Sequence, residues 1–218
     1  CITINDSLVI KSISVSFIEN RVFFNKISLA FTILCLLLFI HASNLFDGIN
    51  LQSILYFKVI FLYLLIFSNF KVLSIIIIIS LFFLVYMNYK NYLFLGDSGI
   101  YLLSSIASFI FINEYNVFKT ILYADEIFVL MMVPGVDMVR LVIFRVLKRK
   151  NPFKGDRNHL HHLLTKKLTI IQTNLLVILM VFLPIFFYKV FSINLVNIIF
   201  SFLLFYIVLI SILIKIRT

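Results

Sequence analysis

The chain has few charged residues, and this scarcity excludes an ordinary soluble protein. Asp, Glu, Lys and Arg make up 13% of the 218 residues, whereas a typical soluble domain has roughly 25%. Hydrophobic residues account for 63%, and the mean hydropathy is +1.14. Acidic residues are the scarcer kind: 19 Lys and Arg against 9 Asp and Glu give a formal net charge of +10. In so apolar a chain we attribute this excess to the cytoplasmic side of membrane spans and to an anionic substrate, and not to nucleic acid.

Cysteines, linkers and repeats are also scarce. The two cysteines exclude a disulfide framework, because Cys35 lies within the apolar run Leu34–Ile40, where a thiol behaves as a small hydrophobic group. No linker rich in Pro or Gly and no internal repeat divides the chain. The first residue is Cys1, and no signal-peptide pattern precedes the first long apolar run. We therefore expect one membrane domain that belongs to a longer protein.

Seven apolar runs approach the length of about 20 residues that a helix needs to cross a membrane. The fourth run has a short uninterrupted apolar part and a polar start. Ahead of them, residues 8–17 partly alternate apolar and Ser residues, which predicts a short strand or hairpin outside the bilayer. We predict an all-α polytopic membrane protein, with an extracytoplasmic strand region at 1–26 and a transmembrane domain at 27–218. The predicted spans are Ile27–Ser43, Leu51–Phe70, Val72–Met87, Leu95–Ile112, Ile127–Leu147, Ile171–Val190 and Ile193–Ile214.

The distribution of Lys and Arg predicts the orientation, because cytoplasmic loops carry an excess of both. They are concentrated in and beside segment 148–170, which we therefore place in the cytoplasm. With seven crossings, the N-terminal region is then extracytoplasmic. Three polar segments share the cytoplasmic side: 44–50, 88–99 and 148–170.

The first polar segment reads Asn-Leu-Phe-Asp-Gly-Ile-Asn from Asn44 to Asn50. One interpretation is a helix end, since Asn and Asp cap helices and Gly48 permits a left-handed turn. The other is a polar pocket whose backbone groups and amides bind a base or a sugar. The motif alone does not decide between the two.

The second polar segment ends in Phe94-Leu95-Gly96-Asp97-Ser98-Gly99, directly before an apolar helix. The glycines around Asp97 let the backbone approach an anion closely, and a helix N-terminus favours negative charge. A carboxylate at that place is suited to a Mg²⁺ ion that bridges phosphates. A helix cap alone would need Asp97 or Ser98, but not both glycines.

The third polar segment holds three of the four histidines, His159, His161 and His162, beside Asp156 and Arg157. Three imidazoles and a carboxylate could bind Zn²⁺, and a solvated basic face could bind anionic lipid headgroups. We favour an anion pocket in which Arg and His donate hydrogen bonds to a pyrophosphate.

Two charged residues interrupt the apolar run upstream of the histidines. Asp137 and Arg140 stand three residues apart, one turn after Pro134 and Gly135. That spacing lets the two side chains pair on one helix face, and charge inside a membrane is costly. The pair is either structural or part of a path through the bundle.

The three segments together resemble those of the polyprenyl-phosphate N-acetylhexosamine-1-phosphate transferases, polytopic enzymes that begin bacterial cell-envelope glycan synthesis. Asn44-x-x-Asp47-Gly48-x-Asn50 is similar to the family's Asn-x-x-Asp-Gly-x-(Asp/Asn)-Gly loop, and Phe94–Gly99 to its Phe-(Met/Leu)-Gly-Asp-x-Gly-Ser loop. The His-Leu-His-His form after Asp-Arg resembles the branch that starts O-antigen and teichoic acid lineages. The last cytoplasmic loop of the family is matched by Pro134, Asp137, Arg145, Pro152, Phe153, Asp156, Arg157, His159, Leu160, His161 and His162.

The resemblance implies transfer of a sugar-1-phosphate from a UDP-N-acetylhexosamine to undecaprenyl or another polyprenyl phosphate, with release of UMP. It implies a multi-pass protein of the bacterial inner membrane, a homodimer, and a requirement for Mg²⁺ that Mn²⁺ can replace. Positioning and charge neutralisation do most of the work in such a transfer. The implied metal ligand is Asp97, and the implied catalytic residues are Asp47, Asp97, His159, His161 and His162. The implied substrate-binding residues are Asn44, Gly48, Ile49, Asn50, Asn88, Phe94 (stacked on uracil), Arg145 and Arg157.

The chain also departs from the family pattern. Leu51 replaces the second Gly of the first loop, Ile100 replaces the Ser after Gly99, and Asn88 is one residue closer to the Gly-Asp loop than the family's Asn. The family's acidic Asp-Asp pair and the lysine before it have no counterpart in these 218 residues. We therefore expect the chain to be the C-terminal part of such an enzyme, inactive alone.

Two other functions compete with the transferase. One is a transporter or channel subunit in which Asp137 and Arg140 line a path through the bundle. The other is a non-catalytic membrane scaffold whose basic loop holds a partner.

Overall fold

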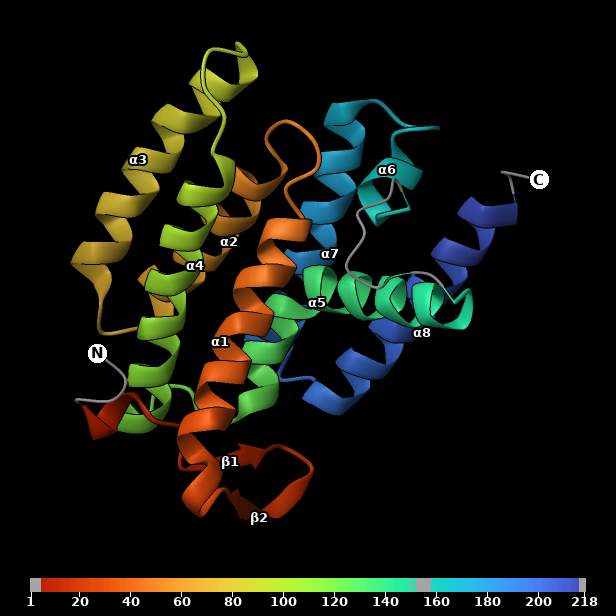
Figure 1. The fold of residues 1–218 in the computed structure, drawn as a ribbon. Helices are drawn as coiled ribbons and strands as arrows, with labels where there is room; N and C mark the ends of the chain where they lie inside the picture. Colours follow the sequence, from red (N-terminus) through yellow and green to blue (C-terminus); the bar gives the residue numbers. More distant parts are fainter. Residues whose placement is uncertain (1–4, 150, 152–157, 216–218) are drawn as a thin grey trace.

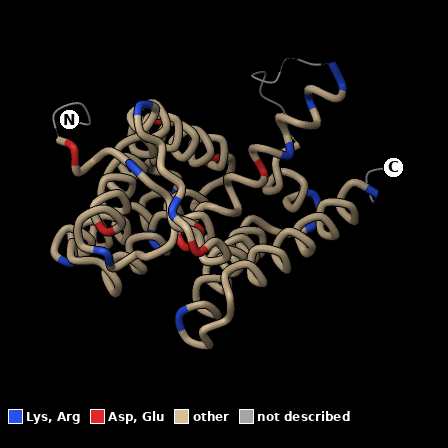
Figure 2. The backbone as a smooth tube through the Cα atoms, turned by 90° about the horizontal axis from the view of Figure 1, so that it is seen from below, with Lys and Arg blue, Asp and Glu red and all other residues tan. Residues whose placement is uncertain are grey.

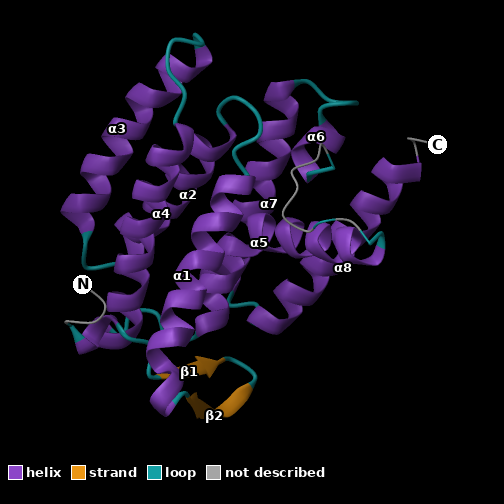
Figure 3. Ribbon diagram, viewed as in Figure 1, coloured by secondary structure: helices purple, strands orange, loops and turns teal. Residues whose placement is uncertain are grey.

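The computed structural model describes residues 5–149, 151 and 158–215 and shows a helical bundle with one small sheet. The sheet consists of β1 (Ser12–Val15) and β2 (Ile18–Phe23). Figures 1 and 3 show this hairpin at one end of the bundle and the α1–α2 and α3–α4 connections at the other. The helices are α1 (Ser28–Leu45), α2 (Gln52–Phe67), α3 (Lys71–Tyr89), α4 (Gly96–Asn113), α5 (Ala124–Leu147), α6 (Leu160–Leu164), α7 (Ile170–Phe191) and α8 (Leu195–Lys215). Shorter turns are η1 (Asp6–Leu8), η2 (Asn25–Ile27) and the π-helical η3 (Glu114–Phe118).

Six helices in the described part of the chain are long and apolar enough to cross a membrane: α1, α3, α4, α5, α7 and α8. The protein is therefore a multi-pass membrane protein by length and composition, but the prediction of seven spans is not confirmed. The predicted span that is not confirmed is Leu51–Phe70, which forms the shorter apolar helix α2, whereas the fourth run, with its polar start, forms α4 and is long enough. The 16 residues of α2 extend about 24 Å, less than the roughly 30 Å of hydrocarbon.

Specific contacts set both ends of α2. Leu51 has the left-handed angles φ 72° and ψ −21°, which no α-helix of L-residues continues. At the other end Ser68 is extended, and the Asn69 N–H donates to Glu114 Oε1 at 2.7 Å. The Glu114 carboxylate thus holds the chain outside the helix before the predicted end at Phe70.

Helix α2 also lies in the interior of the bundle. The side chains of Phe57, Ile60 and Phe61 are completely buried, and α2 packs against α3, α4 and α7. A helix enclosed by other helices does not need to match the thickness of the bilayer, because protein and not lipid surrounds its ends.

Helix α5 bends, and its second half runs sideways toward α6 and α8 (Figure 1). Pro134 lies inside this helix. Proline lacks a backbone N–H, and its ring clashes with the carbonyl four residues earlier, so it kinks a helix. The second half of α5 carries Asp137, Arg140 and Arg145. It runs toward the segment that holds His159, His161 and His162, which we call the histidine segment (Figure 1).

The hairpin confirms the strand predicted near the N-terminus. β1 and β2 are antiparallel, and Ser12 pairs with Phe23. The Ser14 N–H donates to the Tyr115 hydroxyl at 2.6 Å, and the Ile10 N–H donates to Thr32 Oγ1 at 2.8 Å. Ser16 donates to the buried carboxylate of Asp125. These bonds fasten the hairpin to η3, α1 and α5.

A buried ion pair that the sequence analysis did not predict joins three helices. Glu126 on α5 is 1% exposed, forms an ion pair with Lys189 on α7 and accepts a hydrogen bond from the Tyr63 hydroxyl on α2. Figure 2 shows how few charged residues the bundle carries. An unpaired charge would be strongly destabilising in such surroundings, so the pair fixes how α2, α5 and α7 meet.

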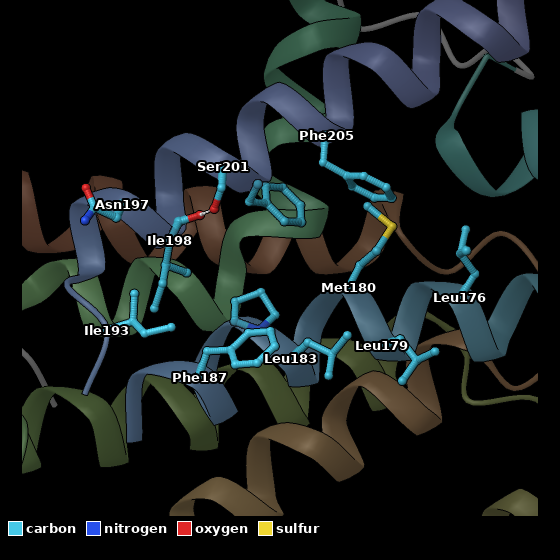
Figure 4. A pocket seen from close by; sticks show the side chains of 12 residues that line it. Leu176, Leu179, Met180, Leu183, Phe187, Ile193, Asn197, Ile198, Ser201 and Phe205 are labelled. Carbon is cyan, nitrogen blue, oxygen red and sulfur yellow. Dashed lines mark hydrogen bonds between the residues drawn. The ribbon is translucent and has the colours of Figure 1, made fainter. Parts of the chain in front are cut away.

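An apolar groove of about 670 Å³ separates parts of α7 and α8 (Figure 4). Leu179, Leu183 and Phe187 of α7 face Ile198 and Phe205 of α8 across it. Helix α8 is accordingly a peripheral helix, and its most apolar window is only 22% buried within the protein.

Candidate functional site

A polar pocket of about 160 Å³ lies where the α1–α2 and α3–α4 connections meet. The two predicted loops are 40 residues apart in the sequence, yet both contribute to its wall. Six of the predicted site residues line it: Asp47, Gly48, Ile49, Asn50, Asn88 and Phe94. Leu51, Ile54 and Leu95 complete the lining. The structure therefore brings together the residues that we expected to border a nucleotide.

The side chain of Asn88 connects the two loops by hydrogen bonds. Its Oδ1 accepts from the Leu51 N–H at 2.7 Å, and its Nδ2 donates to the Leu93 carbonyl at 3.0 Å. Asn88 is 4% exposed. Because both ends of this buried amide bind backbone groups, Asn88 fixes the shape of the pocket wall.

Leu51 occupies the position where the resembled motif has glycine. Its φ of 72° lies in the left-handed region, which glycine enters without cost and which strains other residues. The bond from Leu51 N–H to Asn88 holds this conformation. The departure from the motif therefore changes the side chain and keeps a backbone shape that suits glycine.

Two carboxylates belong to this end of the bundle, Asp47 in the α1–α2 connection and Asp97 in the first turn of α4. Burial raises the pKa of the Asp47 carboxyl, the nearby Ser53 side chain acts in the opposite direction, and the negative charge of Asp97 raises the pKa further. Asp47 is exposed as a residue, so the raised pKa reflects a carboxyl turned partly toward protein atoms. In the described part of the chain neither carboxylate forms an ion pair with Lys or Arg within 4 Å. Two neighbouring carboxylates without a cation partner fit a divalent cation.

Magnesium suits this arrangement better than zinc. Mg²⁺ takes oxygen ligands, and one or two carboxylates suffice when substrate phosphates supply the rest. Among the described residues no group of three or more His, Cys, Asp or Glu is arranged to hold a metal ion. Asp156, the carboxylate of the zinc alternative, lies outside the described residues.

His161 joins the histidine segment to the first loop. A Cβ atom on Gly48 would lie 1.8 Å from His161 Nε2, so only glycine leaves room for the ring. His161 is 1% exposed, and neither ring nitrogen has a hydrogen-bond partner. Its ring stacks on His159 at 5.5 Å between centroids and lies 4.3 Å from His162. Buried polar atoms without partners are rare and point to a functional constraint.

The carboxylate of Asp137 holds the histidine segment on α5. It accepts from Arg140 Nη2 at 2.7 Å and from the Tyr206 hydroxyl at 2.7 Å. It also lies 3.0 Å from His159 Nδ1 and accepts weakly from the Leu160 N–H. The predicted Asp137–Arg140 pairing is confirmed. A carboxylate that is 3% exposed and serves this many partners has little surface with which to line a transport path.

Other predicted residues lie outside the pocket lining. Asn44 at the end of α1 donates to the Tyr101 hydroxyl of α4 at 3.0 Å. Arg145 is buried in the last turn of α5, and His162 is half-buried in α6. Arg157 lies outside the described residues.

Sequence reasoning missed several residues that organise the site. Tyr206 binds Asp137, Asn174 Nδ2 donates to the Asn50 carbonyl at 2.8 Å, and Asn91 Oδ1 accepts from Asn50 Nδ2 at 2.6 Å. The available signal was that Asn174 and Tyr206 are polar groups within apolar spans, where each needs a partner.

No family model, no curated protein and no solved structure matches this chain.

Replacing Gly48 with Ala tests the contact between the first loop and the histidine segment. The added methyl overlaps His161 Nε2, and overpacking of this kind costs about 1–3 kcal/mol. We expect Gly48→Ala to lower the thermal unfolding temperature in detergent. Gly135→Ala is the matched control, because nothing lies within 4 Å of its Cβ position and Ala is the better helix residue. Equal stability of the two variants would contradict the contact.

The pH dependence of stability tests the burial of His161. Burial is the main reason that its pKa is lowered from 6.5 to about 3, and repulsion by His162 and His159 adds to the effect. Between these values the unfolded chain binds a proton that the folded chain does not. The free energy of unfolding therefore falls as pH drops from about 6.5 toward 3, by up to about 1.4 kcal/mol per pH unit from this group.

Unfolding in detergent at a series of pH values measures this slope. We expect His161→Asn to flatten it, and His41→Asn, at an exposed position on α1, to leave it unchanged. An identical slope in the wild type and in His161→Asn would show that His161 is not a buried neutral group.

Proposed function

We propose that this chain forms the nucleotide- and metal-binding wall of a polyprenyl-phosphate N-acetylhexosamine-1-phosphate transferase. The reaction transfers a sugar-1-phosphate from a UDP-N-acetylhexosamine to a polyprenyl phosphate and releases UMP. The proposed location is the bacterial inner membrane, with the pocket on the cytoplasmic side and the hairpin on the other. The opposite placement of the hairpin and the α1–α2 and α3–α4 connections supports this orientation (Figure 1).

The observation that carries the proposal is the convergence of three segments that are far apart in the sequence. Residues 47–50 and the Asn88–Leu95 segment line one pocket, and His161 packs against Gly48. Solvation places polar residues in the loops at either end of a membrane bundle, but it does not by itself bring three distant segments into contact around one pocket. A polar ligand that all three segments contact would account for it.

Each group in the pocket suits one part of a UDP-sugar. Phe94 is 60% exposed at the pocket wall, and an exposed aromatic ring offers a face on which uracil can stack. Asn50 and the backbone of residues 48–49 offer hydrogen-bonding groups to a base or a ribose. The histidine segment on the Gly48 side would face the sugar-phosphate.

Asp97 and Asp47 would hold Mg²⁺ beside the pyrophosphate. Such an ion neutralises charge on the phosphates when it is bound. The start of α4 also favours negative charge, because its first backbone N–H groups point outward. The carboxylates would thus hold the cation, and the N-terminus of α4 would favour the negative charge of the phosphates.

The proposal assigns binding, and not complete turnover, to these 218 residues. The acidic Asp-Asp pair of the resembled family does not occur in them. Binding of the nucleotide sugar is therefore the property to measure on this chain, and transfer to the lipid is the property to measure when a segment with that pair is supplied.

Asp97→Asn tests the metal-dependent part of the site. We expect the wild-type chain in detergent to bind UDP-GlcNAc more tightly with Mg²⁺ than with EDTA. The substitution removes a charged Mg²⁺ ligand, so it should lower the affinity measured with Mg²⁺ at least tenfold and leave the affinity measured with EDTA unchanged. Isothermal titration calorimetry measures both.

Asp6→Asn is the control, because Asp6 is an exposed carboxylate paired with Lys11 near the hairpin. It should bind UDP-GlcNAc as the wild type does. Binding that ignores Mg²⁺, or that is equally strong in Asp97→Asn, would contradict the proposed site.

A further inference from the structure

We propose that Asp137 is a positioning residue that fixes His159 in the tautomer with the proton on Nδ1 and with Nε2 bare. A carboxylate only accepts hydrogen bonds when it is ionised, so the imidazole nitrogen that faces it must carry the proton. Asp137 Oδ2 lies 3.0 Å from His159 Nδ1. Nε2 is therefore the nitrogen left for a ligand.

The surroundings of Asp137 keep its carboxylate ionised and immobile. Its Oδ1 accepts from Arg140 and from Tyr206, each at 2.7 Å. Arg140 also donates from Nε to the Tyr206 hydroxyl at 2.9 Å and from Nη2 to the Asn158 carbonyl at 2.6 Å. With Oδ1 occupied by two strong donors, Oδ2 is the oxygen that orients His159.

The same carboxylate places the start of α6. The Leu160 N–H points at both oxygens, at 3.2 Å to Oδ1 and 3.3 Å to Oδ2. His159 and Leu160 are thus fixed at side chain and backbone together. The next residue, His161, lies against Gly48 as a result, and its ring is parallel to that of His159 within 7°.

The hydrogen bond of the His159 ring is made by Nδ1, and Nε2 has none among the described residues. It is therefore open to a ligand on the side of the site that would face the sugar-phosphate. This part of the inference rests on the proposed function, whereas the tautomer does not.

The tautomer is measured by ¹⁵N NMR on the full chain in detergent, labelled at histidine, at a pH where the rings are neutral. The chain has only four histidines, and the spectrum of His159→Gln assigns the His159 signals. We expect the Nδ1–H form in the wild type. The Nε2–H form of His159 in the wild type, or an even mixture of both forms, would overturn the inference.

In Asp137→Asn the asparagine side chain has nearly the shape of aspartate, but its amide N–H can donate a hydrogen bond to His159 Nδ1. We expect it to reverse the His159 tautomer and to lower the affinity for UDP-GlcNAc with Mg²⁺ at least tenfold. Tyr206→Phe removes a hydrogen bond from the other oxygen of Asp137 and should keep the Nδ1–H form, with a loss of affinity below threefold.

The outcomes separate the two proposals. If the wild type shows the Nδ1–H form but does not bind UDP-GlcNAc, the proposed function fails and the tautomer assignment stands. If Asp137→Asn reverses the tautomer and binds UDP-GlcNAc as the wild type does, the positioning role of Asp137 is overturned. Binding of UDP-GlcNAc by Asp137→Glu would support the role, because the glutamate carboxylate again offers an acceptor to His159 Nδ1.

Discussion

The arrangement of the histidine segment depends on one buried carboxylate, that of Asp137. Asp137 follows Pro134 in α5, a helix that bends and whose second half runs toward α6 and α8 (Figure 1). Arg140 balances its charge, and Tyr206 ties it to α8. A buried charge must be paired and hydrogen-bonded. The partners of Asp137 therefore leave few alternative positions for the segment of His159 and Leu160 that it binds. Residues on the long apolar helices α5 and α8 thereby determine the geometry of the histidine segment at the start of α6.

The few polar residues of this chain serve two separate ends of the bundle. At the hairpin end, Glu114, Asp125 and Glu126 bind backbone groups, hydroxyls and Lys189, and these contacts join the helices to one another and to the sheet. At the loop end, neither Asp47 nor Asp97 forms an ion pair with Lys or Arg among the described residues, and neither ring nitrogen of His161 has a hydrogen-bond partner. Asp125 Oδ1 is also without a partner, but only at the loop end do carboxylates without a cation partner and an unpartnered histidine adjoin one polar pocket, so this arrangement favours the loop end as the functional one.

Sequence reasoning succeeded where the local pattern was sufficient. Each of the seven apolar runs is a helix, six of them long and apolar enough to cross a membrane, the alternation at residues 8–17 predicted a strand, and the first two polar segments both contribute residues to one pocket. It failed where a distant contact decides. Glu114, from the end of α4, shortens α2 by binding Asn69, and the burial of α2 is a property of the whole bundle. The fit of His161 against Gly48, more than 100 residues away, is likewise a tertiary contact that no local pattern contains.

Paramagnetic Mn²⁺ tests most directly whether the three segments form one metal-dependent nucleotide site. It would be added with UDP-GlcNAc to the ¹⁵N-labelled chain in detergent, in place of Mg²⁺. We expect broadening of the backbone amide signals of Gly48, Gly99 and His161 together, while the signals of Ser14 and Thr120, which belong to the hairpin end, remain sharp. Broadening of only one of the three segments, or equal broadening at both ends of the bundle, would contradict a shared site.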